Sequence, residues 1–374
     1  MKLKQVFLAE SAEWKTIKNE TDSPSVALAF SDREKLSDET YINEIKEMFP
    51  DCPVLFGSTS GEICEDSVYD NSIVVTGIEF EKTKLITKQV NISNYNSSYD
   101  AGKALGNAFQ SEDLKHLFVL SDGHHVNGSQ LVKGLKDAIP NPVSLTGGLC
   151  GDAARFEKTL VGFDVPEEGN ICAIGFYGNS IQVGYGSMGG WDSFGPERRV
   201  TKSENNVLYE LDGKSALDLY KEYLGEQAKG LPGTGLLFPL SLKINEEDTP
   251  LVRTILDVNE EEKSMTFAGD LPEGAWVRLM KANFDRLIDG ASVAATRGLV
   301  QSDNSKVAVL ISCVGRKLVL GQRIDEEVES AREVLGEDTL FTGFYSYGEI
   351  SPFTPSATCE LHNQTMTITI FSEG

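Results

Sequence analysis

The fold is decided by three stretches that share one plan: Val54-Leu-Phe-Gly-Ser-Thr-Ser-Gly-Glu-Ile63, Val143-Ser-Leu-Thr-Gly-Gly-Leu-Cys-Gly-Asp152 and Leu340-Phe-Thr-Gly-Phe-Tyr-Ser-Tyr-Gly-Glu-Ile350. Each begins as a short apolar strand, runs into a turn that contains glycine, and has glycine followed by a carboxylate at its end. Glycine allows the backbone to take positive φ or to approach a neighbour closely. We therefore expect three equivalent strand-to-turn elements.

A strand and a helix precede each of these turns. The preceding apolar strands are 26–32, 117–123 and 307–315, and each ends in small or polar residues. Apolar residues then recur at helical spacing in 41–49, 131–139 and 324–335. Further β-rich segments follow the turns at 72–80, 171–177 and 365–371. The pattern predicts a β-α-β-β unit used three times, in an α+β fold of two domains with mixed or antiparallel sheets flanked by helices.

The segment between the second and third units is of a different kind. After the turn at Asp212-Gly213, residues 214–224 have the spacing of an amphipathic helix. Residues 225–235 hold four glycines and a proline, which is typical of a linker. We predict an N-terminal segment at 1–24, a first domain at 25–214 and a second domain at 215–374. The glycine-rich linker is the element that we expect to move.

Composition excludes several classes of partner. The 374 residues carry 34 Lys plus Arg and 57 Asp plus Glu, a formal net charge of −23. A surface this negative repels nucleic acid and anionic bilayers. No apolar run approaches the roughly 20 residues of a membrane span, and the six cysteines form no CxxC pair. We therefore expect a cytoplasmic protein with reduced thiols, no nucleic-acid partner and no membrane insertion.

Several motifs together resemble the FIST family, which pairs a FIST N-terminal with a FIST C-terminal domain. They are residues 147–152, 209–220, 312–317, 344–352 and 361–365. The resemblance implies a sensory protein of signal transduction that regulates a histidine kinase, a diguanylate cyclase or a phosphodiesterase. The chain resembles the stand-alone type, of which some members are described as sensing nitric oxide through haem or another iron cofactor. Cys150 and the Phe56-Gly57-Ser58 run depart from the family pattern at two glycine turns.

Histidine and cysteine are the candidate ligands of such an iron. His362 follows Cys359 at CxxH spacing, and Cys313 stands at a strand end close to the cations Arg316 and Lys317. One axial His or Cys suffices for a haem iron, so His362 and Cys313 are the predicted metal ligands, with Cys359 as a further cofactor contact. The alternatives are a core histidine and an inert buried thiol. No CxxCH motif is present for covalent haem attachment.

A cofactor-free amino-acid or metabolite sensor is the second interpretation. Glu62, Asp152 and Glu349 end the three turns, and a carboxylate there suits an ammonium group. Arg253 or Arg316 suits the α-carboxylate of the same ligand. The alternative is that each carboxylate only completes its turn.

The remaining candidate ligand contacts come from the turns, the polar strand ends and the aromatic residues near the third turn. They are Ser58, Thr59, Asp122, Gly147, Gly148, Tyr345, Tyr347 and Asn363. His124 and His125 are expected on an exposed loop, where at most one of them reaches a ligand.

An enzyme that uses Cys313 as nucleophile, His362 as base and Glu349 as orienting residue is the third interpretation, because such sets are defined by geometry and not by order. Our expectation is a non-catalytic sensor.

Overall fold

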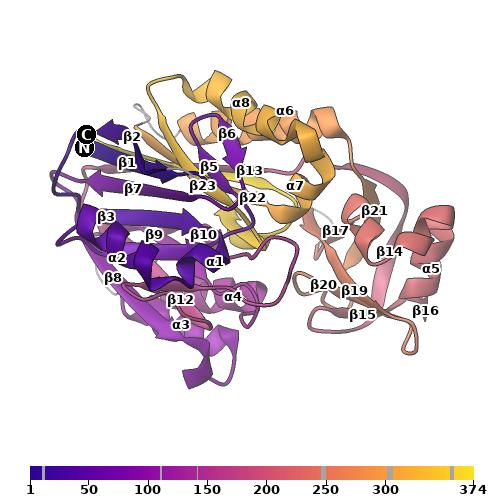
Figure 1. The fold of residues 1–374 in the computed structure, drawn as a ribbon. Coiled ribbons are helices and arrows are strands. Elements are labelled where there is room, and N and C mark those ends of the chain that lie inside the picture. The colour runs from indigo at the N-terminus through magenta and orange to yellow at the C-terminus, as the bar shows by residue number, and fades with distance from the viewer. Residues whose placement is uncertain (11–12, 110–111, 141, 246–249, 301–305, 354–357) are drawn as a thin grey trace.

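Four β-sheets organise the part of the chain that this computed structural model describes, residues 1–374 without 11–12, 110–111, 141, 246–249, 301–305 and 354–357. Three sheets have six strands and mix parallel with antiparallel pairs, and the fourth has eight strands. Helices flank the sheets (Figure 1). The predicted α+β class with mixed and antiparallel sheets is confirmed.

The first sheet has the order β11 (Val161–Phe163), β4 (Val54–Ser58), β3 (Val26–Ser31), β7 (Ile73–Glu79), β1 (Lys2–Leu8) and β2 (Lys15–Asn19). The second has the order β25 (Cys359–His362), β24 (Gly348–Pro352), β10 (Ser144–Leu149), β9 (Leu114–Ser121), β12 (Asn170–Tyr177) and β8 (Lys84–Asn91). The third has the order β13 (Ile181–Met188), β26 (Met366–Glu373), β22 (Val307–Cys313), β23 (Leu340–Ser346), β5 (Glu62–Cys64) and β6 (Ser67–Tyr69).

One arrangement of strands recurs in these three sheets. A central strand, β3, β9 or β22, pairs in parallel with the strand that follows it across a helix, β4, β10 or β23. Parallel neighbours need such a crossover, and it is made by α2 (Glu39–Met48), α4 (Gly128–Ala138) or α8 (Ile324–Leu335). On its other side each central strand pairs antiparallel with β7, β12 or β26.

The three units exchange strands in a cycle. After its glycine turn the first unit sends β5 to β23 of the third sheet, and the third unit sends β24 to β10 of the second sheet. The second unit sends β11 to β4 of the first sheet. Each exchanged strand covers the free edge of another unit's parallel strand, so no one of these sheets is built from a single unit.

The apolar inner faces of the three sheets meet in one core. Phe30 of β3, Phe118 of β9 and Ile311 of β22 belong to a single buried cluster. The ring centroids of Phe30 and Phe344, from two different sheets, lie 4.7 Å apart. The central strands are apolar almost throughout because both of their faces are covered: β3 and β22 are buried at every residue.

Helices pack on the outer faces (Figure 1). α2 buries Ile42 and Ile45 against the first sheet, together with the short α1 (Arg33–Leu36). α3 (Ser98–Asn107) and α4 cover the second sheet. α6 (Phe284–Leu299) and α8 cover the third, and α7 (Val314–Leu320) begins directly at the end of β22. Two 3-10 turns, η1 (Ile92–Asn94) and η4 (Gly321–Arg323), complete this part, which we call the body.

The described residues between 192 and 281 form a separate lobe around the fourth sheet, seen at the right of Figure 1 with the two termini on the far side of the body. Its strands are β18 (Leu251–Arg253), β17 (Leu240–Lys243), β21 (Trp276–Lys281), β14 (Asp192–Glu204), β15 (Val207–Leu211), β20 (Ser264–Phe267), β19 (Ile255–Asn259) and, beside β15, β16 (Lys214–Ser215). The predicted amphipathic helix is α5 (Ala216–Leu224), which buries Leu217 and Tyr220 in the lobe.

The sheets do not divide the chain at the predicted domain boundary between residues 214 and 215. The third sheet takes β5, β6 and β13 from the N-terminal half, and β14 joins the lobe. The glycine-rich stretch forms two 3-10 turns, η2 (Gly225–Gly230) and η3 (Gly233–Leu237), inside the lobe. The link between lobe and body is instead made where β14 begins and β21 ends, at the paired residues Asp192 and Lys281.

Gly147→Ala tests the close packing of parallel strands at the turns. Gly147 has φ of +147°, and an added Cβ would collide with the main-chain oxygen of Val119. We expect the free energy of unfolding, measured by urea denaturation, to fall by about 3 kcal/mol. Gly178→Ala is the control, because Gly178 has φ of +103° with nothing within 4 Å of the added Cβ. It should cost about 1 kcal/mol, and equal losses in the two variants would contradict the packing argument.

Candidate functional site

The three glycine turns meet at one end of the body. The main-chain N–H of Ser60 donates to the oxygen of Tyr345 at 2.8 Å, and the N–H of Tyr345 donates to the oxygen of Gly61 at 2.8 Å. Gly151 N–H donates to Ser58 O at 3.0 Å, which joins the second turn to the first. The carboxyl ends of all three pairs of parallel strands therefore lie together, the place where sheets with parallel strands commonly bind ligands.

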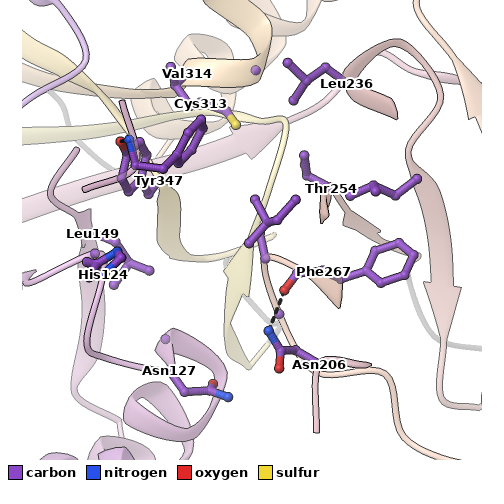
Figure 2. A pocket seen from close by; sticks show the side chains of 18 of the residues that line it. His124, Asn127, Leu149, Asn206, Leu236, Thr254, Phe267, Cys313, Val314 and Tyr347 are labelled. Atoms are coloured by element: carbon purple, nitrogen blue, oxygen red, sulfur yellow. Dashed lines mark hydrogen bonds between the residues drawn. The ribbon is translucent and has the colours of Figure 1, made fainter. Parts of the chain in front are cut away.

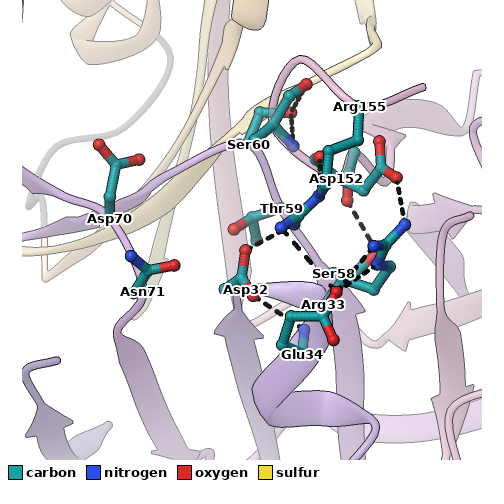
Figure 3. A network of polar contacts seen from close by, with 12 residues as sticks. Asp32, Arg33, Glu34, Ser58, Thr59, Ser60, Asp70, Asn71, Asp152 and Arg155 are labelled. Carbon is teal, nitrogen blue, oxygen red and sulfur yellow. Dashed lines mark hydrogen bonds and ion pairs between the residues drawn. The ribbon is translucent and has the colours of Figure 1, made fainter. Parts of the chain in front are cut away.

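Each unit's turn lies beside the end of another unit's central strand, which gives three equivalent junctions. At the first junction Arg33 pairs with Asp152 at 2.8 Å, and Arg155 pairs with Asp32 at 2.7 Å (Figure 3). At the third junction the Lys317 ammonium donates to the oxygen of Ser60 at 2.9 Å. Ion pairs and a lysine thus fill two of the three junctions.

The second junction has no such cation among its described residues and opens into a cavity of about 670 Å³ between body and lobe (Figure 2). The walls from the body are residues 123–128, Leu149, Phe156, residues 313–315 and Tyr347. The walls from the lobe are Asn206, Pro232, Gly233, Leu236, residues 254–256 and residues 267–269. A volume in this range is typical of small-molecule sites.

Asp122 holds one wall in place. Its buried carboxylate accepts the main-chain N–H groups of His124 at 2.8 Å, His125 at 2.5 Å and Gly169 at 2.9 Å. The loop after β9 is thereby fixed with both histidines on the cavity wall. Gly123 begins this loop because a Cβ there would collide with the main-chain oxygen of Cys150. The sequence predicts that Asp122 contacts a ligand, but its carboxylate is occupied by these main-chain N–H groups and stabilises the cavity wall.

Cys313 and Tyr347 are the predicted site residues that line the cavity. Burial, followed by the nearby charge of Glu349, raises the pKa of the Cys313 thiol to about 12, so the thiol stays protonated at neutral pH. Burial and the hydrogen bond to Asp152 raise the pKa of Tyr347. The Tyr347 ring stacks on Phe156 with the centroids 4.8 Å apart. Both groups are uncharged donors at the cavity wall.

The lobe contributes two polar side chains to the cavity. Asn206 donates from Nδ2 to the oxygen of Phe267 at 2.8 Å (Figure 2). The hydroxyl of Thr254 has no hydrogen-bond partner, although the residue is only 4% exposed. A buried hydroxyl without a partner is costly, and Thr254 is a wall residue whose unpaired hydroxyl is itself buried.

Glu62 and Glu349 brace their turns and do not line the cavity. Glu349 accepts from the hydroxyls of Ser346 at 2.7 Å and Thr365 at 2.9 Å, and from Thr365 N–H at 3.2 Å. Glu62 accepts equivalently from Thr59 and from the N–H and hydroxyl of Ser72, the latter at 2.6 Å. Each carboxylate joins its turn to the start of a later strand. Burial, the largest cause, raises the pKa of Glu62 to about 7 and that of Glu349 to about 8.

Asp152 completes its turn in a similar way (Figure 3). It accepts the N–H groups of three successive residues, Phe156 at 2.9 Å, Glu157 at 3.1 Å and Lys158 at 3.0 Å. It also accepts the hydroxyl of Tyr347. Glu62, Asp152 and Glu349 therefore all complete their turns, as the alternative interpretation of the sequence states.

Arg253 and Arg316 are buried and used internally. Arg253 donates to the carbonyl oxygens of Asp270 at 3.1 Å and Leu361 at 3.1 Å, and burial lowers its pKa to about 10. Arg316 forms an ion pair with Glu327 at 2.6 Å, and both side chains are fully buried. Tyr345 donates to the same Glu327 at 2.6 Å. The structure thus places neither arginine on the cavity wall.

Four other predicted residues stabilise the turns. Ser58 donates to Gly151 O at 2.8 Å, Thr59 donates to Glu62, and Gly147 and Gly148 lie within β10. Gly148 also faces the third sheet, where an added Cβ would lie 2.9 Å from Ile311 Cγ2.

His362 and Cys313 do not form a shared iron site. His362 is buried in β25, and its Nε2 donates to the oxygen of Ser351 at 2.8 Å. Burial lowers its pKa to about 4, so the ring is neutral. Cys359 donates to Leu145 O at 3.3 Å, and Asn363 is buried beside His362 with Oδ1 unpaired. Within the described residues no group of three or more His, Cys, Asp or Glu is placed to hold a metal ion.

The residues with which an iron cofactor was expected to bind therefore do not fit it as a set. The Cys313 thiol lines the cavity, whereas His362 lies outside the cavity with Nε2 bonded to Ser351 O. We derive no chemistry through such a cofactor.

The cavity also includes residues without a decisive signal in the sequence. His124 and His125 follow the polar end of a central strand, and that position could have marked them. The lobe residues Thr254 and Leu236 belong to ordinary apolar stretches, and only the docking of the lobe brings them to the cavity.

Comparison with known proteins identifies the family. The FIST N domain matches residues 25–214 and the FIST C domain matches residues 216–352. The chain belongs to the FIST family, whose domains are associated with sensing in signal transduction. An uncharacterized protein of Methanocaldococcus jannaschii is 26% identical over 221 residues, which are 55% of this chain and 41% of that protein. The chain thus spans less than half the length of this curated relative.

Glu349→Gln tests the buried braces through the pH dependence of stability. The folded chain holds the Glu349 proton more tightly than the unfolded chain, so unfolding between pH 5 and 8 releases a proton and is favoured by rising pH. We expect the wild-type free energy of unfolding to fall over this interval, and the fall to be smaller in Glu349→Gln. The exposed Glu329→Gln is the control. Parallel wild-type and Glu349→Gln curves would contradict a neutral buried brace.

Proposed function

We propose that this FIST protein is a non-catalytic sensor that binds a small molecule in the cavity between body and lobe. The observation that carries the proposal is the second junction, which is open where the other two are filled by Arg33, Arg155 and Lys317. Strand ends, the start of α4 and the lobe converge there. The family's association with sensing supports the same function.

The connection between lobe and body would allow ligand binding to change how the two parts are arranged. Both chain crossings lie side by side, where Asn283 Nδ2 donates to Asp192 at 3.0 Å. A small apolar cluster that includes Trp191, Met280 and Leu287 packs at the same place. A ligand held by both walls favours the arrangement in which lobe and body are closed on it. Such a shift is the signal that a partner protein would read.

The partner that we propose is a signalling enzyme, either a histidine kinase or an enzyme of cyclic-di-GMP metabolism. A formal net charge of −23 would steer the protein toward a basic face of that partner. In the described part of the chain, no helix has the length and apolar character needed to cross a bilayer. A cytoplasmic location remains part of the proposal.

Catalysis by Cys313 and His362 has less support. The thiol is protonated at neutral pH, and His362 Nε2 is bonded to a main-chain oxygen. Glu349, the expected orienting residue, is bonded to Ser346 and Thr365. The amino-acid interpretation is likewise weakened, because Arg253 and Arg316 are both engaged in the interior.

The haem expectation is tested by the visible spectrum of purified protein after incubation with haem. From the side-chain geometry we expect no nitric-oxide-sensitive band that depends on His362. A band present in the wild type, shifted by nitric oxide and lost in His362→Ala would contradict this expectation and restore the haem sensor.

Ala268→Trp tests the cavity as the ligand site. Ala268 lines the cavity from the lobe, so an indole side chain there should exclude ligands. We expect at least one compound of a metabolite library that includes the twenty amino acids to raise the wild-type melting temperature by about 5 °C at saturation. The same compound should leave Ala268→Trp unchanged.

Val300→Trp is the matched control, because Val300 is 80% exposed and does not line the cavity. It should respond as the wild type does. Equal stabilisation of all three proteins would place the ligand elsewhere and would refute the proposed site.

A further inference from the structure

The described cavity walls hold few ionisable side chains. None of the described lining residues is Lys, Arg, Asp or Glu. The titratable groups of the wall are His124, His125, Cys313 and Tyr347, and the last two are held in their uncharged forms. Half of the lining residues are aliphatic or aromatic, as with Leu149, Leu236, Ile255 and Phe267.

The carboxylates behind the walls are already paired with protein groups. Asp122 accepts the N–H groups of the His124 loop, and Asp152 accepts Tyr347 and three main-chain N–H groups. The Asp270 carboxylate accepts from Asn127 Nδ2 at 2.8 Å at the start of α4. An acid of the lobe therefore already lies against the positive end of that helix, which offers little to an anionic ligand.

Arg253 lies directly behind Gly269, where an added Cβ would be 2.9 Å from its Nε. Its guanidinium donates to the oxygens of Val252, Asp270 and Leu361 and stays behind the wall. A charged ligand group in the cavity would lose hydration without meeting a Lys, Arg, Asp or Glu among the described lining residues, which is costly.

Thr254 is a polar residue of the cavity wall with a buried hydroxyl. Its hydroxyl is one of five buried side-chain atoms without a partner in the described structure. Of the residues that carry these atoms, Thr254 alone lines the cavity. Thr342, the other unpaired threonine, lies in β23 and is fully buried.

We propose that the cavity selects an uncharged, largely apolar small molecule with one polar group, and that the buried Thr254 side chain turns to form a hydrogen bond with that group. The inference rests on the proposed function and adds the chemical class of the ligand. It is distinct from an amino-acid sensor, because a zwitterion has two charges and no Lys, Arg, Asp or Glu of the described lining pairs with them.

Two fluorescent probes with the same ring system test the charge rule. N-phenyl-1-naphthylamine is uncharged, and 1-anilinonaphthalene-8-sulfonate is the same molecule with one sulfonate. Titrations in about 0.5 M sodium chloride shorten the electrostatic screening length to about 4 Å, so the net charge of the protein does not decide the result. We expect saturable binding of the uncharged probe and at least tenfold weaker binding of the sulfonate.

Thr254→Val tests the hydrogen bond. Valine keeps the shape of the side chain and removes the hydroxyl, so the uncharged probe, whose amine donates to that oxygen, should bind about fivefold to tenfold more weakly. Thr342→Val is the matched control, since it removes an equally buried and unpaired hydroxyl outside the cavity. It should change the dissociation constant less than twofold. Ala268→Trp should abolish binding of the uncharged probe.

The outcomes separate this inference from the proposed function. Equal binding of both probes, abolished in Ala268→Trp, would overturn the uncharged class and leave the cavity as the ligand site. Equal affinities in Thr254→Val and Thr342→Val would overturn the role of the hydroxyl. Binding of the uncharged probe that persists in Ala268→Trp, or no saturable binding of either probe, would overturn the ligand class and the cavity site together.

Discussion

The main-chain hydrogen bonds between exchanged strands are the constraint on which the rest of the structure depends. Without β11, β24 and β5, the parallel strands β4, β10 and β23 would each present a row of unpaired N–H and C=O groups at a sheet edge. Each unit covers the edge of another unit, so the three sheets stabilise one another. The turns that carry the exchange must then lie together, because each leaves its own sheet to enter the next.

The fold class followed from the sequence because its signals are local. Continuous apolar strands such as Val26–Ser31 and Val307–Cys313, each followed by a helical spacing, identify the mixed sheets before any contact is known. The exchange itself leaves no such signal. β5 has three residues, Glu62–Cys64, and nothing in them indicates that their partner is β23, almost 280 positions later in the chain.

The candidate site was harder to predict for a related reason. Glu62, Glu349, Arg316 and His362 are candidates in the sequence because their side chains are chemically active. In the structure all four are buried in the body, where they have structural roles. Buried charged and polar groups need partners: Glu62 and Glu349 bond to residues of their turns and at the start of later strands, and Arg316 and His362 bond to other buried groups. Thr254 has no unusual feature in the sequence and becomes informative only because folding leaves its hydroxyl unpaired at a cavity.

The three junctions show how a repeated architecture produces a single site. Their backbone is equivalent, so the difference lies in the residues that follow each central strand. Asp32-Arg33 leads to ion pairs with the second turn, and Lys317 reaches the first turn. Gly123-His124 forms no comparable contact with a neighbouring turn, because glycine has no side chain and the histidine N–H is bonded to Asp122. The lobe covers this open junction, and the enclosed volume belongs to both parts of the molecule. In the described structure this is the only one of the three junctions that charged side chains do not fill. A ligand bound there contacts both lobe and body and can therefore alter how the two pack against each other.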